Sequence, residues 1–427
     1  MKRVALVTGH YAPSNLAAVH RSRMWSYHLR EFGWEPVVVT THWDHYEEQL
    51  DWDLADLLPE DVEVVRTGAI PTKPVRLVGD IGFRGFLWHY NAIVKLARTK
   101  GLDFVHINIP SNYSALLGRL IRYSLGIPYG IDYIDPWVHF WPGSEVPFSK
   151  AWLTRNLSSF LEPIAVKNVS LISGITPGYC EGVFERHPEL MDEAVEAYMP
   201  YGASEKDFEM VRKRLKPTSE FEEDGLFHVV YAGALLPKSI RPLRHLLEAM
   251  RIVASEDETF ANRFRLHMIG TGSDPVDNES HQVLPIAREM DVEELVTEHP
   301  ARMSYVQVLS HLVKSSGILI LGSIEPHYSP SKTFQAIQAE KPIMAILHEV
   351  STAVTYLREC DAGEVVTLDE TDGPDVPELC RALRKFMARE NESPEQRPEI
   401  PEHQTARGVS QVLAEAMDEV LLRRAEQ

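Results

Sequence analysis

Three segments of the sequence combine glycine, hydroxyl groups and lysine in a way that suits the binding of a phosphate group. They are Gly9–Asn15, Gly233–Lys238 and Tyr328–Gln335, and each follows a short apolar run that is typical of a buried strand. Glycine lets the backbone turn sharply and approach a ligand, and a helix that begins after such a turn favours an anion at its N-terminus. These segments therefore predict contacts with an anionic ligand.

The segment Tyr328–Gln335 carries the most specific signal. It opens a helical pattern for which Ser329 or Ser331 is the expected N-cap. Lys332 would then lie in the first helical turn, where the helix macrodipole disfavours a cation. A bound phosphate would reverse the sign of that interaction, so we expect Lys332 to contact the ligand. The alternative is a surface lysine that is tolerated at a cost of a few tenths of a kcal/mol.

The two segments that begin with glycine are less specific. Gly233 allows close approach to a ligand, and Lys238 could reach a diphosphate, with Arg241 as a second cation nearby. The alternative is a solvated lysine on a turn. For Gly9 the alternative is an ordinary strand-to-helix turn.

Two aspartates, Asp132 and Asp135, follow another predicted strand and form a pair that could hold a metal ion. An aspartate at the end of a strand that caps or orients a loop explains them equally well. The 18 histidines are accompanied by no cysteine or carboxylate pattern of the zinc-site type. These residues by themselves therefore do not favour a metal site.

Composition narrows the classes of function. The chain has 427 residues and a formal net charge of -19, which disfavours nucleic acid as a partner because a uniformly acidic protein repels phosphate backbones. Its three cysteines are far apart, so we expect no disulfide framework. The apolar run Val4–Val7 is too short for a signal peptide, and no stretch approaches a transmembrane helix. The sequence predicts a cytoplasmic protein, peripheral at most at the inner face of the membrane.

One segment contrasts with this acidic background. Residues 73–100 carry six lysines and arginines against a single aspartate, interleaved with aromatic residues. A surface that contacts anionic lipids has this character, so we expect a peripheral membrane contact here. The alternative is a solvated helix with one face in the core.

Short apolar runs alternate with helical patterns along the whole chain, which predicts parallel, doubly wound sheets. A helical pattern over residues 18–32 ends at Gly33. The predicted strands are Val4–Val7, Val37–Val39, Val62–Val65, Phe104–Ile109, Tyr129–Ile134 and Val169–Ile175, followed by Phe227–Ala232, Phe264–Ile269, Ile318–Leu321, Pro342–Ile346 and Glu364–Val366.

These elements predict two Rossmann-like domains, residues 1–210 and 225–405. The segment Ser204–Gly225 between them is charged and lacks an apolar run, which indicates a linker. Ligands of open parallel sheets bind beyond the carboxyl ends of the strands, so the cleft between the domains is the expected site. Residues 406–427 contain a helical pattern that we expect to pack back on the first domain.

The same segments, in this order, resemble the family 4 glycosyltransferases over the whole chain, and most closely their bacterial polysaccharide-biosynthesis members. Ser331-Lys332 followed by Lys341-Pro342-Ile343 is similar to the family's S-K-x-x-E-Y-M-A-x-G-K-P-I, the most specific of the matching motifs. The other matches are Tyr11-Ala12-Pro13 with Arg21, Asp132–Trp137, Pro200–Ala203 with Asp207-Phe208, Tyr231–Gly233, Met268–Gly272 and Ala362-Gly363.

The resemblance implies a GT-B fold, with an N-terminal acceptor domain and a C-terminal domain for the nucleotide sugar. It implies a metal-independent, hexosyltransferase-like enzyme that moves a sugar from that donor, with retention, to a glycan, lipid-linked or small-molecule acceptor. No other cofactor is implied. The expected catalytic residues are Lys332, Asp135 and His139. The expected donor-binding residues are Gly9, Gly233, Lys238, Arg241, Gly270, Gly272, Arg302, Glu325, His327, Ser331, Lys332 and Gln335.

Three positions depart from the family's pattern. Ala234 stands where the family usually has arginine, Gln335 where it has the glutamate for the donor ribose, and Glu340 where it has glycine. The amide of Gln335 can still hydrogen-bond a ribose hydroxyl, and Lys238 or Arg241 could replace the lost arginine. Two alternatives therefore stay open: a GT-B protein that binds a nucleotide sugar without turnover, and a sugar-nucleotide epimerase.

Overall fold

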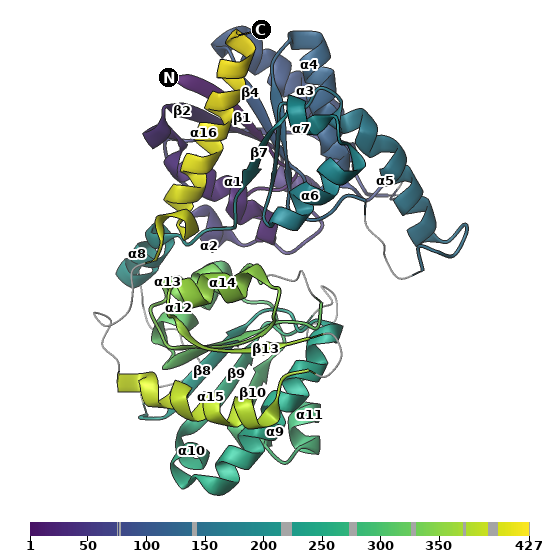
Figure 1. Cartoon of the computed structure of the whole chain (residues 1–427). Coiled ribbons are helices and arrows are strands. Elements are labelled where there is room, and N and C mark those ends of the chain that lie inside the picture. The colour runs from purple at the N-terminus through teal and green to yellow at the C-terminus, as the bar shows by residue number, and fades with distance from the viewer. Residues whose placement is uncertain are drawn as a thin grey trace. The chain divides into compact units, whose positions relative to one another are not determined.

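The computed structural model divides the chain into two compact units (Figure 1). The first unit is Met1–Gly202 together with Ala406–Gln427, and the second is Ala203–Thr405. The residues that the structure describes are 1–74, 76, 78–138, 143–214, 224–272, 280–325, 330–369, 373–391 and 400–426.

The first unit is built on a sheet of seven parallel strands in the order β3-β2-β1-β4-β5-β6-β7. The order reverses between β1 and β4, which is the position where open α/β sheets bind ligands. The strands are β1 (Lys2–Val7), β2 (Trp34–Thr41), β3 (Glu63–Thr67), β4 (Phe104–Asn108), β5 (Tyr129–Tyr133), β6 (Leu171–Gly174) and β7 (Val195–Tyr198).

Helices cover both faces of this sheet, because its strands are apolar on both sides. One apolar core joins the sheet to α3 (Ile81–Lys100), α4 (Leu116–Leu125), α5 (Lys150–Val166) and α6 (Pro177–Arg186). A second core, on the other face, joins it to α1 (Ala17–His28) and α16 (Ala406–Ala425), which lie side by side (Figure 1). Short helices α2 (Trp52–Ala55) and α7 (Leu190–Glu193) complete the unit.

The second unit has a sheet of six parallel strands in the order β10-β9-β8-β11-β12-β13. Here the order reverses between β8 and β11. The strands are β8 (Phe227–Ala232), β9 (Phe264–Ile269), β10 (Val296–His299), β11 (Gly317–Leu321), β12 (Ile343–His348) and β13 (Gly363–Leu368).

The core of the second unit lies between one face of this sheet and four helices: α9 (Ile240–Glu256), α10 (Glu258–Arg263), α11 (Leu284–Glu289) and α15 (Val376–Ala388). Helices α9 and α15 are neighbours in this layer (Figure 1). The remaining helices are α8 (Glu205–Arg214), α12 (Tyr305–Lys314), α13 (Thr333–Gln338) and α14 (Thr352–Glu359).

The fold class expected from the sequence is confirmed: both sheets are parallel and α-helices alternate with their strands. Every predicted strand forms, with ends shifted by at most a few residues. The sequence analysis missed β7 and β10, whose four residues each are too short for a clear apolar run. The helix predicted up to Gly33 is shorter: α1 ends at His28, and a 3-10 turn, Leu29–Phe32, continues to Gly33, whose left-handed φ of 83° ends it.

The interpretation of Ser204–Gly225 as a linker is wrong over its first half. Helix α8 occupies Glu205–Arg214 and belongs to the second unit. Its Phe208 and Val211 are buried, and Asp207 accepts a hydrogen bond of 3.0 Å from the hydroxyl of Tyr305 on α12. Two buried apolar side chains suffice to dock a helix of mostly charged residues. Residues 215–223 lie outside the described part of the chain.

Candidate functional site

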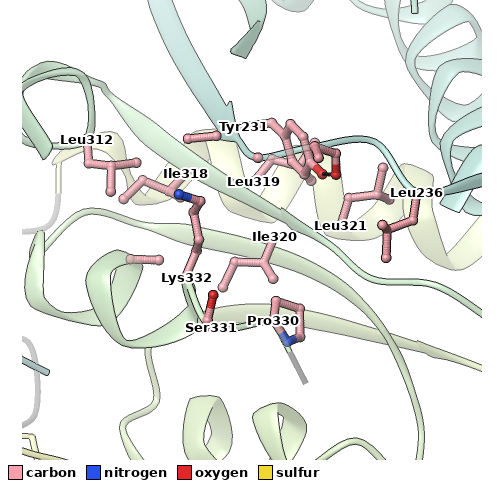
Figure 2. A pocket seen from close by; sticks show the side chains of 14 residues that line it. Tyr231, Leu236, Leu312, Ile318, Leu319, Ile320, Leu321, Pro330, Ser331 and Lys332 are labelled. Atoms are coloured by element: carbon pink, nitrogen blue, oxygen red, sulfur yellow. Dashed lines mark hydrogen bonds between the residues drawn. The ribbon is translucent and has the colours of Figure 1, made fainter. Parts of the chain in front are cut away.

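A pocket opens at the carboxyl ends of β8 and β11, where the strand order of the second unit reverses (Figure 2). The pocket is open to solvent, and its empty space of about 770 Å³ includes part of that solvent. The lining residues are Tyr231, Ala232, Gly233, Ala234, Leu236, Leu312, Ile318, Leu319, Ile320, Leu321, Pro330, Ser331, Lys332 and Ala336. Two of the three segments singled out in the sequence, those at Gly233 and Lys332, thus line one pocket.

Lys332 is the one charged side chain among these lining residues, and it projects into a largely apolar pocket (Figure 2). It is partly exposed, yet desolvation by the surrounding atoms lowers the pKa of its ammonium group to about 8. The charge of Arg302 lowers this pKa further in the same direction. A desolvated cation with a second cation nearby gains more from a bound anion than a solvated lysine does.

Gly233 lies next to Lys332 at the pocket, where a Cβ would be at ordinary contact distance from its neighbours. A side chain at this position would place its Cβ 3.7 Å from Cε of Lys332 and 3.6 Å from the hydroxyl of Tyr231. The amide of Gly233 donates to the carbonyl of Ile269, which ties the segment to the end of β9. The glycine therefore leaves the mouth of the pocket open beside the lysine.

The expected serine N-cap is not what the structure contains. The N-cap of α13 is Lys332, without a side-chain capping bond. The turn is closed by Thr333, whose amide and hydroxyl both donate to the carbonyl of Pro330. Because α13 has only six residues, its dipole is a weaker argument for the site than the pocket itself. Ser331 lines the pocket, and Ser329 lies outside the described residues.

Gln335 is buried and turns back toward its own loop. With its amide nitrogen facing the loop, it donates to the carbonyl of Ser331 at 2.7 Å and to that of Lys332 at 3.2 Å. A glutamate could not make these bonds, because a carboxylate only accepts. The substitution that departs from the family's pattern thus braces the segment that carries Lys332.

Lys238 and Glu325, two further donor-binding candidates, bind each other. Their side chains form an exposed ion pair with a distance of 2.9 Å. The oxygen of Ser323 accepts a hydrogen bond from the amide of Glu325, which orders the loop after β11. A diphosphate would compete with Glu325 for Lys238. Arg241 is exposed on the first turn of α9, next to Gly373.

Gly270 and Gly272 flank a loop that a buried carboxylate holds. Glu298 accepts hydrogen bonds from the hydroxyl of Thr271 at 2.6 Å and from the amides of Val283 and Leu284 at 2.9 Å each. Gly270 has a left-handed φ of 69°, and its amide donates to the carbonyl of His299. These bonds hold Thr271 beyond the end of β9, and sequence reasoning gave no sign of Glu298.

In the first unit, Gly9 is explained by packing. A Cβ at this position would lie 2.6 Å from the side chain of Ile81, at the start of α3. The helix can approach the end of β1 only because residue 9 has no side chain. Close packing accounts for this glycine without a ligand.

Asp132 is structural. Its carboxylate receives Nε and NH2 of Arg21 in a bidentate, fully buried pair, with 2.7 Å between NH2 and Oδ1, and it also accepts from the hydroxyl of Ser173. Arg21 donates further to the carbonyls of Met199 and Pro200. Burial opposes the charge of Asp132, but Arg21 outweighs it and keeps the pKa below its usual value. This carboxylate is saturated, which removes it as a metal ligand.

Asp135 lies just beyond β5 with an exposed side chain, although the surrounding protein desolvates its carboxyl group and raises its pKa to about 6. A carboxylic acid with that pKa can exchange a proton near neutrality. The other two candidates of this kind, His139 and His327, lie outside the residues that the structure describes.

A histidine–carboxylate pair that the sequence analysis did not select lies at the carboxyl end of β1. Nδ1 of His10 is 2.8 Å from Oε1 of Glu48, which also accepts from the hydroxyl of Ser14. Burial opposes ionisation of Glu48, but the bonds and charge of His10 outweigh it and lower the pKa to about 2. An ionised carboxylate makes Nδ1 the donor, so Nε2 carries the lone pair when His10 is neutral. Thirty-eight residues separate the pair, so no local spacing reveals it.

The basic segment 73–100 is less available than its composition suggests. Arg84 is buried, and its guanidinium donates to the carbonyls of Ile70 and His45. Arg76 pairs with Glu47, and Lys100 pairs with Glu63. Half of the six basic residues are therefore engaged by the protein itself.

Groups that could bind a metal ion and helices that could span a membrane can both be looked for within the described residues. No group of three or more histidine, cysteine, aspartate or glutamate side chains there is arranged to hold a metal ion. None of the helices in those same ranges is both long enough and apolar enough to cross a bilayer.

Comparison with known proteins finds similarity in three dimensions only. No family model and no curated protein sequence matches the chain. Among solved structures it is similar to sucrose-phosphate synthase from Thermosynechococcus elongatus, with TM-score 0.58, 15% identity and coverage of 100% of this chain and 98% of that one. HepE from Anabaena, in complex with UDP-glucose, gives TM-score 0.53 and 12% identity, with 100% of both chains covered. A UDP-N-acetylglucosamine 2-epimerase gives TM-score 0.53 and 13% identity, covering 100% and 98%.

These similarities, over the full length of the chain, show that it has the GT-B fold. At such low identity they show the fold alone. The fold is shared by enzymes that transfer sugars from nucleotide donors and by UDP-N-acetylglucosamine 2-epimerases. The similarities fix neither the particular GT-B family nor the reaction, so both have to be inferred from the residues of the site.

Proposed function

We propose that this protein is a glycosyltransferase that takes its sugar from a nucleotide-sugar donor bound in the pocket at β8 and β11. The observation that carries the proposal is Lys332, a desolvated cation in an otherwise apolar pocket at the point where the strand order reverses. Apolar walls suit a base and a sugar ring, and the single cation suits a diphosphate. The resemblance of this segment to family 4 glycosyltransferases points to the same function.

In the proposed reaction, Lys332 stabilises the departing nucleoside diphosphate. The bond between the anomeric carbon and the phosphate oxygen breaks, and negative charge develops on that oxygen. A fixed cation in a site of low dielectric stabilises such charge strongly. Lys238 joins it when the diphosphate displaces Glu325, and Arg302 adds positive potential near Lys332. Ser331 offers a hydroxyl donor at the same place.

The first unit is the proposed acceptor-binding part. The acceptor is a glycan, a lipid-linked sugar or a small molecule, and its hydroxyl oxygen forms the new bond to the anomeric carbon. For a retaining transfer the proton of that hydroxyl passes to the departing phosphate. Asp135, His139 and the pair of His10 with Glu48 are the candidates that orient the acceptor.

A panel of nucleotide sugars, assayed for release of nucleoside diphosphate and analysed for sugar products, tests the proposal. Transfer to an added acceptor, or to water at a slower rate, supports it. A changed sugar still attached to its nucleotide would indicate an epimerase, which shares the fold. Saturable binding without release or isomerisation would indicate a non-catalytic binding protein, a possibility that Ala234 and Gln335 keep open.

A further inference from the structure

The exposed apolar residues of this protein are concentrated on a single layer. Fifteen large hydrophobic side chains are exposed in the described chain, and nine of these belong to α3, α4, α5 or the turn before α5. They are Phe83, Leu87, Trp88, Tyr123, Val146, Phe148, Leu153, Leu157 and Phe160. Because α3, α4 and α5 pack on the same face of the seven-stranded sheet, these side chains share the outer side of one layer.

Helix α5 has the clearest pattern. Leu153, Leu157 and Phe160 are spaced four and three residues apart, which places them on one stripe of the helix, and Phe160 is 67% exposed. The buried positions, Ser158 and Glu162 among them, lie on the opposite side. Leu153, Leu157 and Phe160 therefore point away from the core, in which Val166 is buried and against which Leu161 packs.

The turn before α5 extends the stripe. Phe148 is 82% exposed, and its ring lies 5.4 Å from that of Trp152. The hydroxyl of Ser149 accepts from the amide of Trp152 and donates to the carbonyl of Gly143. The aromatic residues at the start of α5 are thus presented by an ordered, capped turn.

The charge of the same layer is opposite to that of the chain. The protein has 62 acidic residues and a net charge of -19. Helices α3, α4 and α5 contain only one of these carboxylates, Glu162, which is buried and paired with Arg186. Their basic residues are Arg84, Lys95, Arg98, Lys100, Arg119, Arg122, Lys150 and Arg155. Of these, Arg84 is buried and Lys100 pairs with Glu63, so the other six supply the positive charge of the surface.

We infer that this layer, with the stripe on α5 at its centre, is a docking surface for an anionic lipid membrane. Exposed leucine and aromatic side chains on a helix enter the headgroup boundary, and lysine and arginine beside them attract anionic headgroups. A second copy docked through the same layer would bring two basic surfaces together, whereas anionic headgroups complement their charge. The surface is independent of the nucleotide-sugar pocket, and it extends to α5 a contact that the sequence placed on residues 73–100 alone.

Sedimentation with phosphatidylcholine vesicles, with and without phosphatidylglycerol, tests the inference. The wild-type chain should sediment with the anionic vesicles and be largely released by high salt. A variant with Leu153→Ser, Leu157→Ser and Phe160→Ser should partition about tenfold less, since each buried apolar side chain contributes to insertion. The matched control is Met191→Ser with Val350→Ser, which removes exposed apolar side chains elsewhere and should bind as the wild type does.

Circular dichroism and thermal unfolding establish that the variants are folded, which is expected because the replaced side chains are exposed. A wild-type chain that stays in the supernatant with anionic vesicles overturns the inference, as does a triple variant that binds equally well.

Light scattering on the protein as it elutes from a sizing column tests the other possible occupant of the stripe, a second copy of this chain. A wild-type dimer that the triple substitution converts to a monomer, without vesicle binding, would assign the stripe to self-association. Nucleotide-sugar turnover without added lipid should be unchanged in the triple variant, so loss of vesicle binding is separable from loss of activity.

Discussion

At the scale of single residues, Lys332 combines properties that oppose each other in the unliganded protein. It is a cation, it is desolvated, and Arg302 is near enough to disfavour its charge further. Each of these costs is reduced when an anion binds, because the anion restores charged hydrogen bonds and offsets the repulsion. A residue that violates local preferences in this way is typical of a functional site.

The first prediction follows from that balance. Lys332→Ala should weaken binding of a nucleoside diphosphate such as UDP by about 1.5–3 kcal/mol, measured by titration calorimetry, and should slow turnover by more if the contact strengthens in the transition state. The substitution should leave the fold intact. Lys213→Ala, which removes an exposed lysine of the same unit, is the matched control.

The pKa of Lys332 gives this prediction a second readout. Only the ammonium form attracts the diphosphate, and its pKa in the free protein is about 8. Affinity of the wild type should therefore be highest below pH 8 and should fall as the pH rises through that value, with proton uptake on binding near pH 8. The Ala variant should lack this dependence. Unchanged affinity and a flat profile in both proteins would make Lys332 an ordinary surface lysine.

At the scale of elements, polar side chains on three adjacent strands are linked in a chain, in which the two histidines are buried and the threonine is exposed. Nδ1 of His228 on β8 is 2.8 Å from Nε2 of His267 on β9, and Nδ1 of His267 is 2.8 Å from the hydroxyl of Thr297 on β10. Burial, together with the nearby charge of His228, lowers the pKa of His267 to about 3. The pair is stable while it is neutral, and protonation of both rings would place two cations in contact.

The second prediction concerns stability against acid. In the unfolded chain a histidine binds its proton near pH 6.5, whereas His267 in the folded chain does so only near pH 3. Its contribution is therefore fully present above pH 6.5 and is lost as the pH falls from 6.5 toward 3. We expect the second unit to lose roughly 2 kcal/mol between pH 7 and pH 5 from this group, measured by urea unfolding. His267→Gln should flatten the slope. The control His403→Gln, at an exposed histidine, should leave the slope of stability against pH unchanged. Equal slopes in all three proteins would contradict the argument.

The third prediction concerns α16, which is distant in sequence from the unit that it stabilises. Its inner side chains, Leu413 and Met417 among them, belong to the same core as Trp25 of α1. Leu413→Ala should destabilise the first unit by about 2–5 kcal/mol, because it leaves a cavity in a packed core. Leu422→Ala, on the exposed side of the same helix, should cost less than about 0.5 kcal/mol. Chemical denaturation measures both, and similar losses would mean that α16 is not an integral part of that core.

At the scale of the whole molecule, the two units carry different kinds of groups at the ends of their strands. The proposed donor pocket has a lysine and no carboxylate among its lining residues, and the nearby Glu325 is paired with Lys238. The first unit has a saturated aspartate, Asp132, and a histidine oriented by Glu48. This division agrees with a proposed donor side that neutralises phosphate by cations and an acceptor side that handles hydroxyl groups.

The fourth prediction is that catalysis needs no divalent metal ion and retains the anomeric configuration. A cation that bridges two phosphates needs hard oxygen ligands, usually one or two carboxylates, whereas the pocket would neutralise the diphosphate with Lys332. Activity in excess EDTA, and the anomeric linkage of the product relative to the donor, are the measurements. Loss of activity that magnesium or manganese restores would refute the metal part. An inverted linkage would require a general base, and His10→Gln and Glu48→Gln would then be the first variants to make.

The sequence by itself determined the secondary structure and the fold class. Buried parallel strands such as Phe227–Ala232 must be continuously apolar, and this property is local enough to recognise. It also selected Lys332 as a candidate, because serine, lysine and the following helix are neighbours in the chain, and the structure places this residue in a pocket. The sequence did not predict the short strands β7 and β10 or the helix α8, since contacts with distant residues stabilise them.

Only the tertiary structure decided what each polar side chain does. Asp132 is paired with Arg21, which lies 111 residues away, and Gln335 braces the loop that carries Lys332. His10 acquires Glu48, and Lys238 acquires Glu325, over separations of 38 and 87 residues. A hydrogen bond or ion pair depends on distances of about 3 Å between atoms, and such distances arise only when strands distant in sequence are brought to one edge of a sheet.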